Sequence, residues 1–212
     1  MLELSIKTLV AYLLGSLIGS LLVGRARGVD IRTLGSGNAG GTNALRTQGS
    51  RFAVAVMLID VGKAMLAVGV LPEWSLPGIG IDTRVDRQWL AVSCAIAVVV
   101  GHVYPVWYEF RGGKGAATLI GAVAMLSPLA LVPVLLVWLV AVTTTGYVGL
   151  STMLGAAALP LFYLAHDRSS TALVVFGCVM AVFVAFTHRS NIGRMRQGSE
   201  NRARRLWLLR PR

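Results

Sequence analysis

The sequence predicts an all-α, polytopic integral membrane protein with seven transmembrane helices, some of them short or broken. Of the 212 residues, 55% are hydrophobic and only 14% are charged, whereas about a quarter of the residues of a soluble domain carry charge. The mean hydropathy is +0.70, and several apolar runs have about 20 residues, the length that an α-helix needs to cross a bilayer. We expect one compact membrane domain over residues 1–200 and a basic tail over 201–212.

The apolar runs indicate where these helices lie. The first covers residues 4–23, and we expect it to be retained, because it has neither the basic n-region nor the A-x-A cleavage site of a signal peptide. The other runs cover residues 52–71, 89–107, 116–142, 148–165 and 171–187.

Positive charge predicts the orientation in the membrane. Residues 25–51 contain five arginines and one acidic residue, and 188–212 contain eight arginines and one glutamate, whereas 73–88 contain three acidic residues and two arginines. Because basic segments stay in the cytoplasm, we expect the tail and 25–51 on the inner side of the cytoplasmic membrane. The N-terminus and 73–88 are then outside.

The run 116–142 must supply two helices if the basic tail is to end inside. It contains Ser127 followed by Pro128, and proline breaks or kinks a helix because it lacks a backbone donor. We predict a hairpin that turns near Ser127, with arms of roughly 18–25 Å at 1.5 Å per residue. At least one arm then fails to cross the ~30 Å hydrocarbon core. The alternative is one tilted helix, with the hairpin elsewhere.

In this topology four polar segments face the cytoplasm and are expected to converge on one site. They are the first glycine-rich segment (34–49), the second glycine-rich segment (101–118), the hydroxyl-rich segment (143–152) and the histidine segment (188–200).

The first glycine-rich segment, LGSGNAGGTNALRTQG, predicts an anion site. Glycine permits positive φ, so that backbone N–H groups converge on an anion, and an arginine offers a two-pronged donor for phosphate. A helix over 42–57 would add the dipole of its N-terminus. The residues concerned are Gly35, Ser36, Gly37, Asn38, Gly40, Gly41, Thr42, Asn43 and Arg46. The context excludes a dinucleotide-binding fold, because no strand precedes the segment.

The second glycine-rich segment, GHVYPVWYEFRGGKGAAT, places Lys114 among glycines whose amides we expect to be exposed. These are Gly112, Gly113 and Gly115. It is not a nucleotide-binding P-loop, because Lys114 is followed by glycine instead of serine or threonine. The aromatic residues at 104–110 are typical of an interfacial belt, and we expect His102 to be a structural residue at a helix end.

The hydroxyl-rich segment, TTTGYVGLST, either lines the site or forms a plain turn. In the histidine segment, His188, Asn191 and Arg194 recur every three residues, so that they would share one helix face where the last helix leaves the membrane.

The remaining charged and sulfur residues have structural interpretations. Asp60 and Lys63 lie within an apolar run, where charges usually pair, and we expect an ion pair. We expect Cys94 and Cys178 to be small buried hydrophobic residues, and no Cys–His spacing predicts a metal site. The arginine-rich tail is typical of a segment lying on anionic lipid, and we expect no nucleic-acid binding.

The sequence resembles the bacterial acyl-phosphate-dependent glycerol-3-phosphate acyltransferases, the PlsY family. GSGNAGGTNALR, GHVYPVWYEFRGGKGAAT and HRSNIGRMRQGSE are similar to its three signature motifs in order and spacing, and DVGK at 60–63 is similar to its second helix. The resemblance extends from about Tyr12 to Glu200. It implies a seven-helix enzyme that needs no cofactor, metal, acyl-CoA or obligatory protein partner. Such an enzyme transfers a fatty acyl group from acyl phosphate to the sn-1 hydroxyl of glycerol 3-phosphate. The products are lysophosphatidic acid and phosphate, in the first step of phospholipid synthesis.

Carried over by position, the resemblance implies two sets of site residues. The catalytic set is Ser36, Arg46, Lys114, His188 and Asn191. The substrate-binding set is Gly37, Asn38, Thr42, Asn43, Gly112, Gly113, Gly115, Ser151 and Glu200. Where the family often has Arg-Tyr-x-Ser-Leu-Ser, this chain has Gly-Tyr-Val-Gly-Leu-Ser at 146–151, so that Ser151 is the residue expected to contribute from there.

The chemistry of the transfer leaves the base open. Arg46 and Lys114 would stabilise charge on the departing phosphate and on the oxyanion. His188 is one candidate to accept the hydroxyl proton. A phosphate oxygen of a substrate is the other, which we favour because no carboxylate is obviously placed to orient His188. Glu200 either orients it or anchors the tail through arginine contacts.

The alternative function is a membrane anion transporter or channel, because basic, glycine-rich segments between broken helices also suit transport. The clustering of polar residues on one side argues against it. An acyl-CoA-dependent acyltransferase would show histidine followed five residues later by aspartate, and no histidine here is followed in this way. A CDP-alcohol phosphotransferase needs clustered aspartates for its metal, and those of this chain are scattered.

Overall fold

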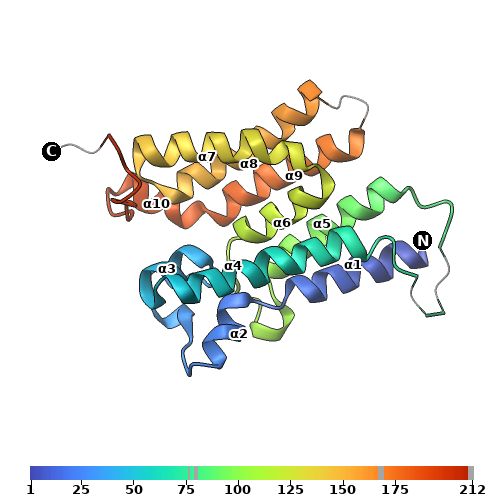
Figure 1. The fold of residues 1–212 in the computed structure, drawn as a ribbon, viewed down its shortest axis with the longest axis horizontal. Coiled ribbons are helices and arrows are strands. Elements are labelled where there is room, and N and C mark those ends of the chain that lie inside the picture. Colours follow the sequence, from blue (N-terminus) through green and yellow to red (C-terminus); the bar gives the residue numbers. More distant parts are fainter. Residues whose placement is uncertain (76, 79–80, 167–169, 210–212) are drawn as a thin grey trace. The chain divides into compact units, whose positions relative to one another are not determined.

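The structure, a computed structural model, describes residues 1–75, 77–78, 81–166 and 170–209, and every regular element in these ranges is helical (Figure 1). The predicted all-α class is therefore confirmed. The contacts within the chain divide it into two compact units, Met1–Leu126 and Ser127–Arg212. The single domain over 1–200 stays a prediction.

The first unit contains six α-helices among its described residues, joined by short turns of other helix types. The α-helices are α1 (Leu2–Gly15), α2 (Gly19–Arg25), α3 (Gly41–Gln48), α4 (Ser50–Met65), α5 (Arg87–Val103) and α6 (Ala116–Leu126). The short elements are η1 (Ile31–Thr33), the π-helical η2 (Leu66–Val70) and η3 (Val106–Tyr108). The second unit contains η4 (Pro128–Ala130), α7 (Leu131–Thr145), α8 (Val148–His166), α9 (Thr171–Thr187) and α10 (Arg189–Arg196).

Among the described residues, four helical stretches are long and apolar enough to cross a membrane, or six if each of two bent helix pairs forms one span. The four are Ser50–Val70, Arg87–Tyr108, Pro128–Thr145 and Val148–His166. The bent pairs are α1 with α2, at 48°, and α9 with α10, at 52°. The seventh apolar segment, α6, has 11 residues and is only about 16 Å long, too short to cross a ~30 Å core. One short arm was expected, and the count of seven spans stays a prediction.

The predicted break in the run 116–142 is confirmed. α6 ends at Leu126, Ser127 leaves the helical conformation (φ −160°, ψ 85°), and Pro128 opens the next helical turn. Proline is tolerated at this first position because the N–H that it lacks would have no partner there. The hairpin itself stays a prediction.

The first apolar run, expected as one helix over 4–23, is divided into two helices, which agrees with the expectation that some of the helices are broken. α1 ends at Gly15, and the chain bends before α2 begins at Gly19. The end of α1 packs directly on the backbone of α5, since a side chain at Gly15 would collide with the carbonyl of Val98. A side chain at Gly101 would likewise collide with the carbonyl of Tyr12. Hydropathy alone cannot reveal such a break, because the residues around it are apolar.

Two expectations need correction. The helix predicted over 42–57 is two helices, because Gly49 (φ 83°) separates α3 from α4. Cys94 is buried as expected, but Cys178 on α9 is exposed. A helix that is apolar all round has one side against the protein, and the other is free to face lipid.

Candidate active site

The first glycine-rich segment begins at a short, electrostatically capped turn. The carboxylate of Asp30 accepts a hydrogen bond from the N–H of Arg32 at 2.9 Å and pairs with its guanidinium at 2.8 Å. This side-chain bond lowers the pKa of Asp30 below its ordinary value and raises the pKa of Arg32. Arg32 Nη1 also donates to the carbonyl of Tyr108 at 3.3 Å. The start of this segment is therefore tied to the second glycine-rich segment.

Asn43 shapes the segment from within. Its side chain is buried, its Oδ1 accepts the N–H of Ser36 at 3.0 Å, and its Nδ2 donates to the carbonyls of Ile31 and Leu34 at 3.2 and 2.9 Å. Both of its amide hydrogens are therefore used inside the protein. Asn43 holds the loop in shape, which differs from the expected role of a donor to the anion.

Glycine is required at two positions of this loop. Gly35 (φ +58°) and Gly37 (φ +72°) have the left-handed backbone that glycine adopts without strain. A side chain at Gly35 would also collide with Oδ1 of Asn43. Gly40 precedes α3 with an extended backbone (φ −106°, ψ 165°). The predicted special backbone is thus found at two of the four glycines.

The open part of the segment is the start of α3 together with Arg46. No side chain caps the N-terminus of α3, where the first N–H groups of a helix have no partner within it. Ser36, Thr42 and Arg46 are exposed. Within the described part of the chain, Arg46 makes no hydrogen bond or ion pair. Thr42 and Arg46 are four residues apart and share one face of α3, so that an anion can meet unpaired amides, a hydroxyl and a guanidinium.

A buried ion cluster of Asp60, Lys63 and His102 supports both glycine-rich segments. Lys63 Nζ lies 3.0 Å from Oδ1 of Asp60 and 2.9 Å from Nδ1 of His102. All three side chains are at most 5% exposed. The predicted ion pair and the structural role of His102 are thus confirmed.

This cluster closes the break between α1 and α2. Lys63 donates to the carbonyls of Gly15 and Leu17 at 2.8 and 2.7 Å, and Asp60 accepts the N–H of Gly19 at 3.1 Å. Lys63 therefore binds the carbonyl end of α1, and Asp60 binds the amide end of α2. Both arrangements are favoured by the helix dipoles. One residue further on, the hydroxyl of Ser20 donates to the carbonyl of Ala39 at 2.7 Å, which fixes the first glycine-rich segment.

The glycines of the second glycine-rich segment serve packing. The N–H of Gly112 donates to the carbonyl of Val103, and that of Gly113 to the carbonyl of His102, both at 3.1 Å. The expectation that these two amides are exposed was therefore wrong. A side chain at Gly113 would collide with the ring of His102. Gly115 has φ +87° just before α6, and Lys114 is half-buried beside it. The close return of the chain onto α5 sets the position of Lys114.

In the second unit, Glu200 joins the polar residues of the histidine segment. Its Oε1 accepts a bond from Asn191 Nδ2 at 2.7 Å, and its Oε2 pairs with Arg194 Nε at 2.6 Å. Glu200 thus anchors the tail through an arginine, which was one of its two expected roles. His188 is oriented by a backbone carbonyl, since its Nδ1 lies 2.8 Å from the oxygen of Val184. A carbonyl can only accept, so Nδ1 carries a hydrogen, and in the neutral ring Nε2 is left as the acceptor.

The hydroxyl-rich segment lies against the histidine segment, as expected. Gly149 at the start of α8 faces Asn191 so closely that a Cβ would lie 2.8 Å from its Nδ2. Ser151 is buried, and its hydroxyl donates to the carbonyl of Tyr147 at 2.8 Å. The hydroxyls of Thr143 and Thr145 also donate to carbonyls of their own helix. Each unit therefore brings two of the four segments together, and the convergence of all four stays a prediction.

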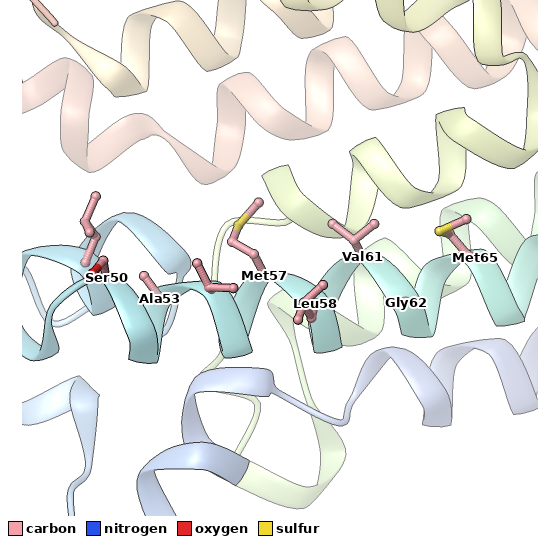
Figure 2. A pocket seen from close by; sticks show the side chains of 9 residues that line it. Ser50, Ala53, Met57, Leu58, Val61, Gly62 and Met65 are labelled. Carbon is pink, nitrogen blue, oxygen red and sulfur yellow. The ribbon is translucent and has the colours of Figure 1, made fainter.

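An apolar groove that sequence reasoning missed runs along α4 (Figure 2). Its volume is about 480 Å³, and its lining residues are Leu45, Ser50, Ala53, Val54, Met57, Leu58, Val61, Gly62 and Met65. Met57, Val61 and Met65 point from the same side of the helix in Figure 2. The sequence of α4 does contain apolar side chains at helical spacing, which could have indicated the groove. The same spacing, however, is also typical of a lipid-facing surface. Leu45 belongs to α3 and directly precedes Arg46, so the groove begins beside the exposed arginine of this helix.

Apolar helices long enough to cross a bilayer, with an uncapped helix start and an exposed arginine next to an apolar groove, are the features of a polytopic membrane protein. The family model for glycerol-3-phosphate acyltransferase matches residues 5–198, and the chain belongs to this family. The chain is 41% identical to the glycerol-3-phosphate acyltransferase of Geobacter sulfurreducens, with 95% of this chain and 98% of that protein covered. It is 36% identical to that of Chlorobaculum parvum, with 91% and 93% covered.

Solved structures agree with this assignment. The chain is similar to the crystal structure of PlsY, an integral membrane glycerol 3-phosphate acyltransferase, in its glycerol 3-phosphate form. The TM-score is 0.80 at 32% identity, with 94% of each chain covered. The lysophosphatidic acid form of PlsY gives a TM-score of 0.80 at 30% identity, with 96% of this chain and 97% of that chain covered.

Proposed function

We propose that this protein transfers a fatty acyl group from acyl phosphate to the sn-1 hydroxyl of glycerol 3-phosphate, giving lysophosphatidic acid and inorganic phosphate. The observation that carries the proposal is the unpaired Arg46 near the uncapped start of α3. It lies next to the end of the apolar groove that Leu45 lines. A reaction between a soluble phosphate compound and an acyl chain needs a polar anion site adjoining such a groove. The two PlsY forms, named for glycerol 3-phosphate and lysophosphatidic acid, support these ligands.

The proposal includes the topology that the charge pattern predicts. We place seven membrane segments in the cytoplasmic membrane, with the N-terminus outside and the tail inside. The short α6 and the bent pair of α1 and α2 count among them. All four polar segments then face the cytoplasm, where a soluble phosphate ester is available. Thiol labelling that placed residues 34–49 and 188–200 on opposite sides of the membrane would contradict this arrangement.

The site residues divide into those that contact substrate and those that hold them in place. Arg46 and Lys114 stabilise charge on the departing phosphate and on the oxyanion of the transition state. Ser36, Asn38 and Thr42, with the backbone of Gly37, bind phosphate oxygens in the first glycine-rich segment. The positioning residues are Asn43, Gly112, Gly113, Gly115, Asn191, Ser151 and Glu200. Inorganic phosphate is a good leaving group, so its departure needs little assistance from an acid. Most of the rate acceleration can then come from holding the two reactants together.

His188 has the right tautomer to act as a base toward the glycerol hydroxyl. With Nδ1 bound to the carbonyl of Val184, Nε2 is the nitrogen that accepts a proton in the neutral ring. A phosphate oxygen of a bound substrate is the alternative acceptor. A pH–rate profile that is flat between about pH 6 and 8 would exclude a titrating histidine as the base.

The donor assay tests the function. Purified protein in detergent should release phosphate from palmitoyl phosphate only when glycerol 3-phosphate is present, and should form lysophosphatidic acid in equal amount. Palmitoyl-CoA should not replace palmitoyl phosphate as the donor. Inactivity with both donors, together with phosphate flux in liposomes, would instead establish transport.

The groove is proposed to bind the acyl chain. The lining of α4 from Ser50 to Met65 covers about 22 Å at 1.5 Å per residue, more than half of the ~30 Å hydrocarbon core. A chain that entered from one leaflet would therefore fit along it.

Gly62→Leu tests this assignment of the groove. Apart from its chain neighbours and the nearby backbone of its own helix, no atom lies within 4 Å of a Cβ placed at Gly62, which lines the groove. We therefore expect a leucine there to extend into the groove. We expect the KM for palmitoyl phosphate to rise about tenfold, the effect of losing one or two buried methylenes. The KM for glycerol 3-phosphate should not change, and Gly62→Ala should behave nearly as wild type. Equal changes in both KM values would contradict the assignment.

A further inference from the structure

A C-terminal strap, residues 201–209, follows the stretch that the family model covers, which ends at residue 198. The strap binds the last carbonyls of α7, which a helix end leaves without partners. The N–H of Ala203 donates to Gly146 at 2.8 Å, the N–H of Leu208 to Thr143 at 2.9 Å, and Nε1 of Trp207 to Thr144 at 2.9 Å. The strap is therefore held at both ends on the last turn of α7 and on Gly146, which follows it.

Aromatic contacts fix the middle of the strap. The guanidinium of Arg202 lies 4.5 Å from the ring centre of Tyr147 and 4.1 Å from that of Trp207, within the range of cation–π attraction. Gly146 (φ +76°) makes room for this packing, because a Cβ there would lie 3.1 Å from the Trp207 ring. The guanidinium of Arg202 is thus engaged in contacts within the protein.

The other side chains of the strap are free to meet something outside the protein. Leu208 and Leu209 are 75% and 69% exposed, and Leu206 is 43% exposed. Arg204 and Arg205 are exposed, and within the described residues neither makes a hydrogen bond or an ion pair. Exposed leucines beside unpaired arginines are the composition of segments that lie at a membrane surface.

The position of the strap along α7 is also consistent with a location at the membrane surface. α7 carries an exposed apolar face made of Val132, Leu135, Leu136, Leu139 and Val140. This face ends where the strap donates to the carbonyl of Thr143. A helix with an exposed apolar face of this kind contacts lipid tails, so the residue that follows it lies at the level of the headgroups.

We propose that the C-terminal strap is a docking surface for anionic phospholipid headgroups of the membrane. Leu206, Leu208 and Leu209 enter the boundary between headgroups and acyl chains, while Arg204 and Arg205 bind headgroup phosphates. Glu200, which holds Asn191 and Arg194, directly precedes the strap. Lipid binding therefore also restrains the histidine segment. The proposal does not depend on the acyl-transfer function.

The test measures contact between the strap and lipid in the full-length protein. A fluorophore on Leu206→Cys, in a Cys178→Ser background that removes the exposed thiol, is quenched by lipid that carries a nitroxide at headgroup depth. We compare nanodiscs of phosphatidylcholine with nanodiscs that also contain phosphatidylglycerol. Quenching should be stronger with the anionic lipid and should weaken in high salt. The contact equilibrium should fall about fivefold for each arginine removed in Arg204→Gln/Arg205→Gln.

The matched control is Arg25→Gln/Arg51→Gln. It removes the same charge from two exposed arginines of the first unit and should leave the quenching unchanged. Quenching that is independent of lipid charge, or that falls equally in both double variants, would overturn the proposal. Circular dichroism of each variant establishes that the helices are retained.

Discussion

Replacing Arg46 with alanine is expected to lower kcat/KM for acyl transfer by about 100- to 1000-fold, the usual effect of removing one donor from a transition-state anion site. The reason is specific to its position. Arg46 is the exposed cation on α3 that shares a face with Thr42 and adjoins the uncapped N-terminus of that helix. Because it is exposed and makes no hydrogen bond or ion pair with the described residues, its loss should change the free energy of unfolding by no more than about 0.5 kcal/mol. Activity with palmitoyl phosphate and thermal unfolding, measured on the same preparation, check both parts.

Arg51→Ala is the matched control for this experiment. Arg51 is also exposed, lies five residues further along and belongs to the first turn of α4. It removes the same charge without touching the open part of the first glycine-rich segment, and its variant should retain activity. If Arg46→Ala were nearly as active as wild type, the anion site would have to be placed elsewhere.

Replacing Lys63 with methionine is expected to destabilise the protein by about 3–5 kcal/mol, the cost of leaving a buried charge without its partner. The carboxylate of Asp60, 1% exposed, would lose its cation. The carbonyls of Gly15 and Leu17, which Lys63 now binds at the break between α1 and α2, would lose their donor as well. Thermal unfolding in detergent would show the lower stability.

The double variant Asp60→Asn/Lys63→Met separates charge from packing. Removing both charges takes away the unpaired carboxylate, so the double variant should be more stable than Lys63→Met alone. Its activity should nevertheless be below that of wild type, because the break that Lys63 closes is next to Ser20, which holds the first glycine-rich segment. Strictly additive losses of stability would show that Asp60 and Lys63 do not interact.

The helix positions could be predicted largely from hydropathy and proline. Ser127 and Pro128 interrupt an apolar run, and the structure ends α6 at Leu126 for the reason expected. The break after Gly15 could not be predicted in this way. It depends on the contact of Gly15 with the backbone of α5 and on a lysine 48 residues away, and neither contact leaves a local pattern.

In the candidate site, the sequence indicates which residue types are present, but not which role each of them has. Glycine, asparagine and arginine in the first segment indicated an anion site, and Arg46 lies open there. Asn43 and the amides of Gly112 and Gly113 were expected to donate to a ligand, but in the folded chain they donate to backbone carbonyls. The sequence shows which donor groups exist, but only the fold shows whether a backbone carbonyl lies close enough to accept their hydrogen bonds.

Composition, charge distribution and three short motifs were sufficient to establish an all-α membrane protein and to indicate its family, because these properties depend only on which residues occur and in what order. The groove along α4, the ion cluster that closes the first broken helix and the strap over the end of α7 were decided by tertiary contacts. Each joins residues distant in the chain, or depends on which side of a uniformly apolar helix is covered. Local patterns carry no information about either.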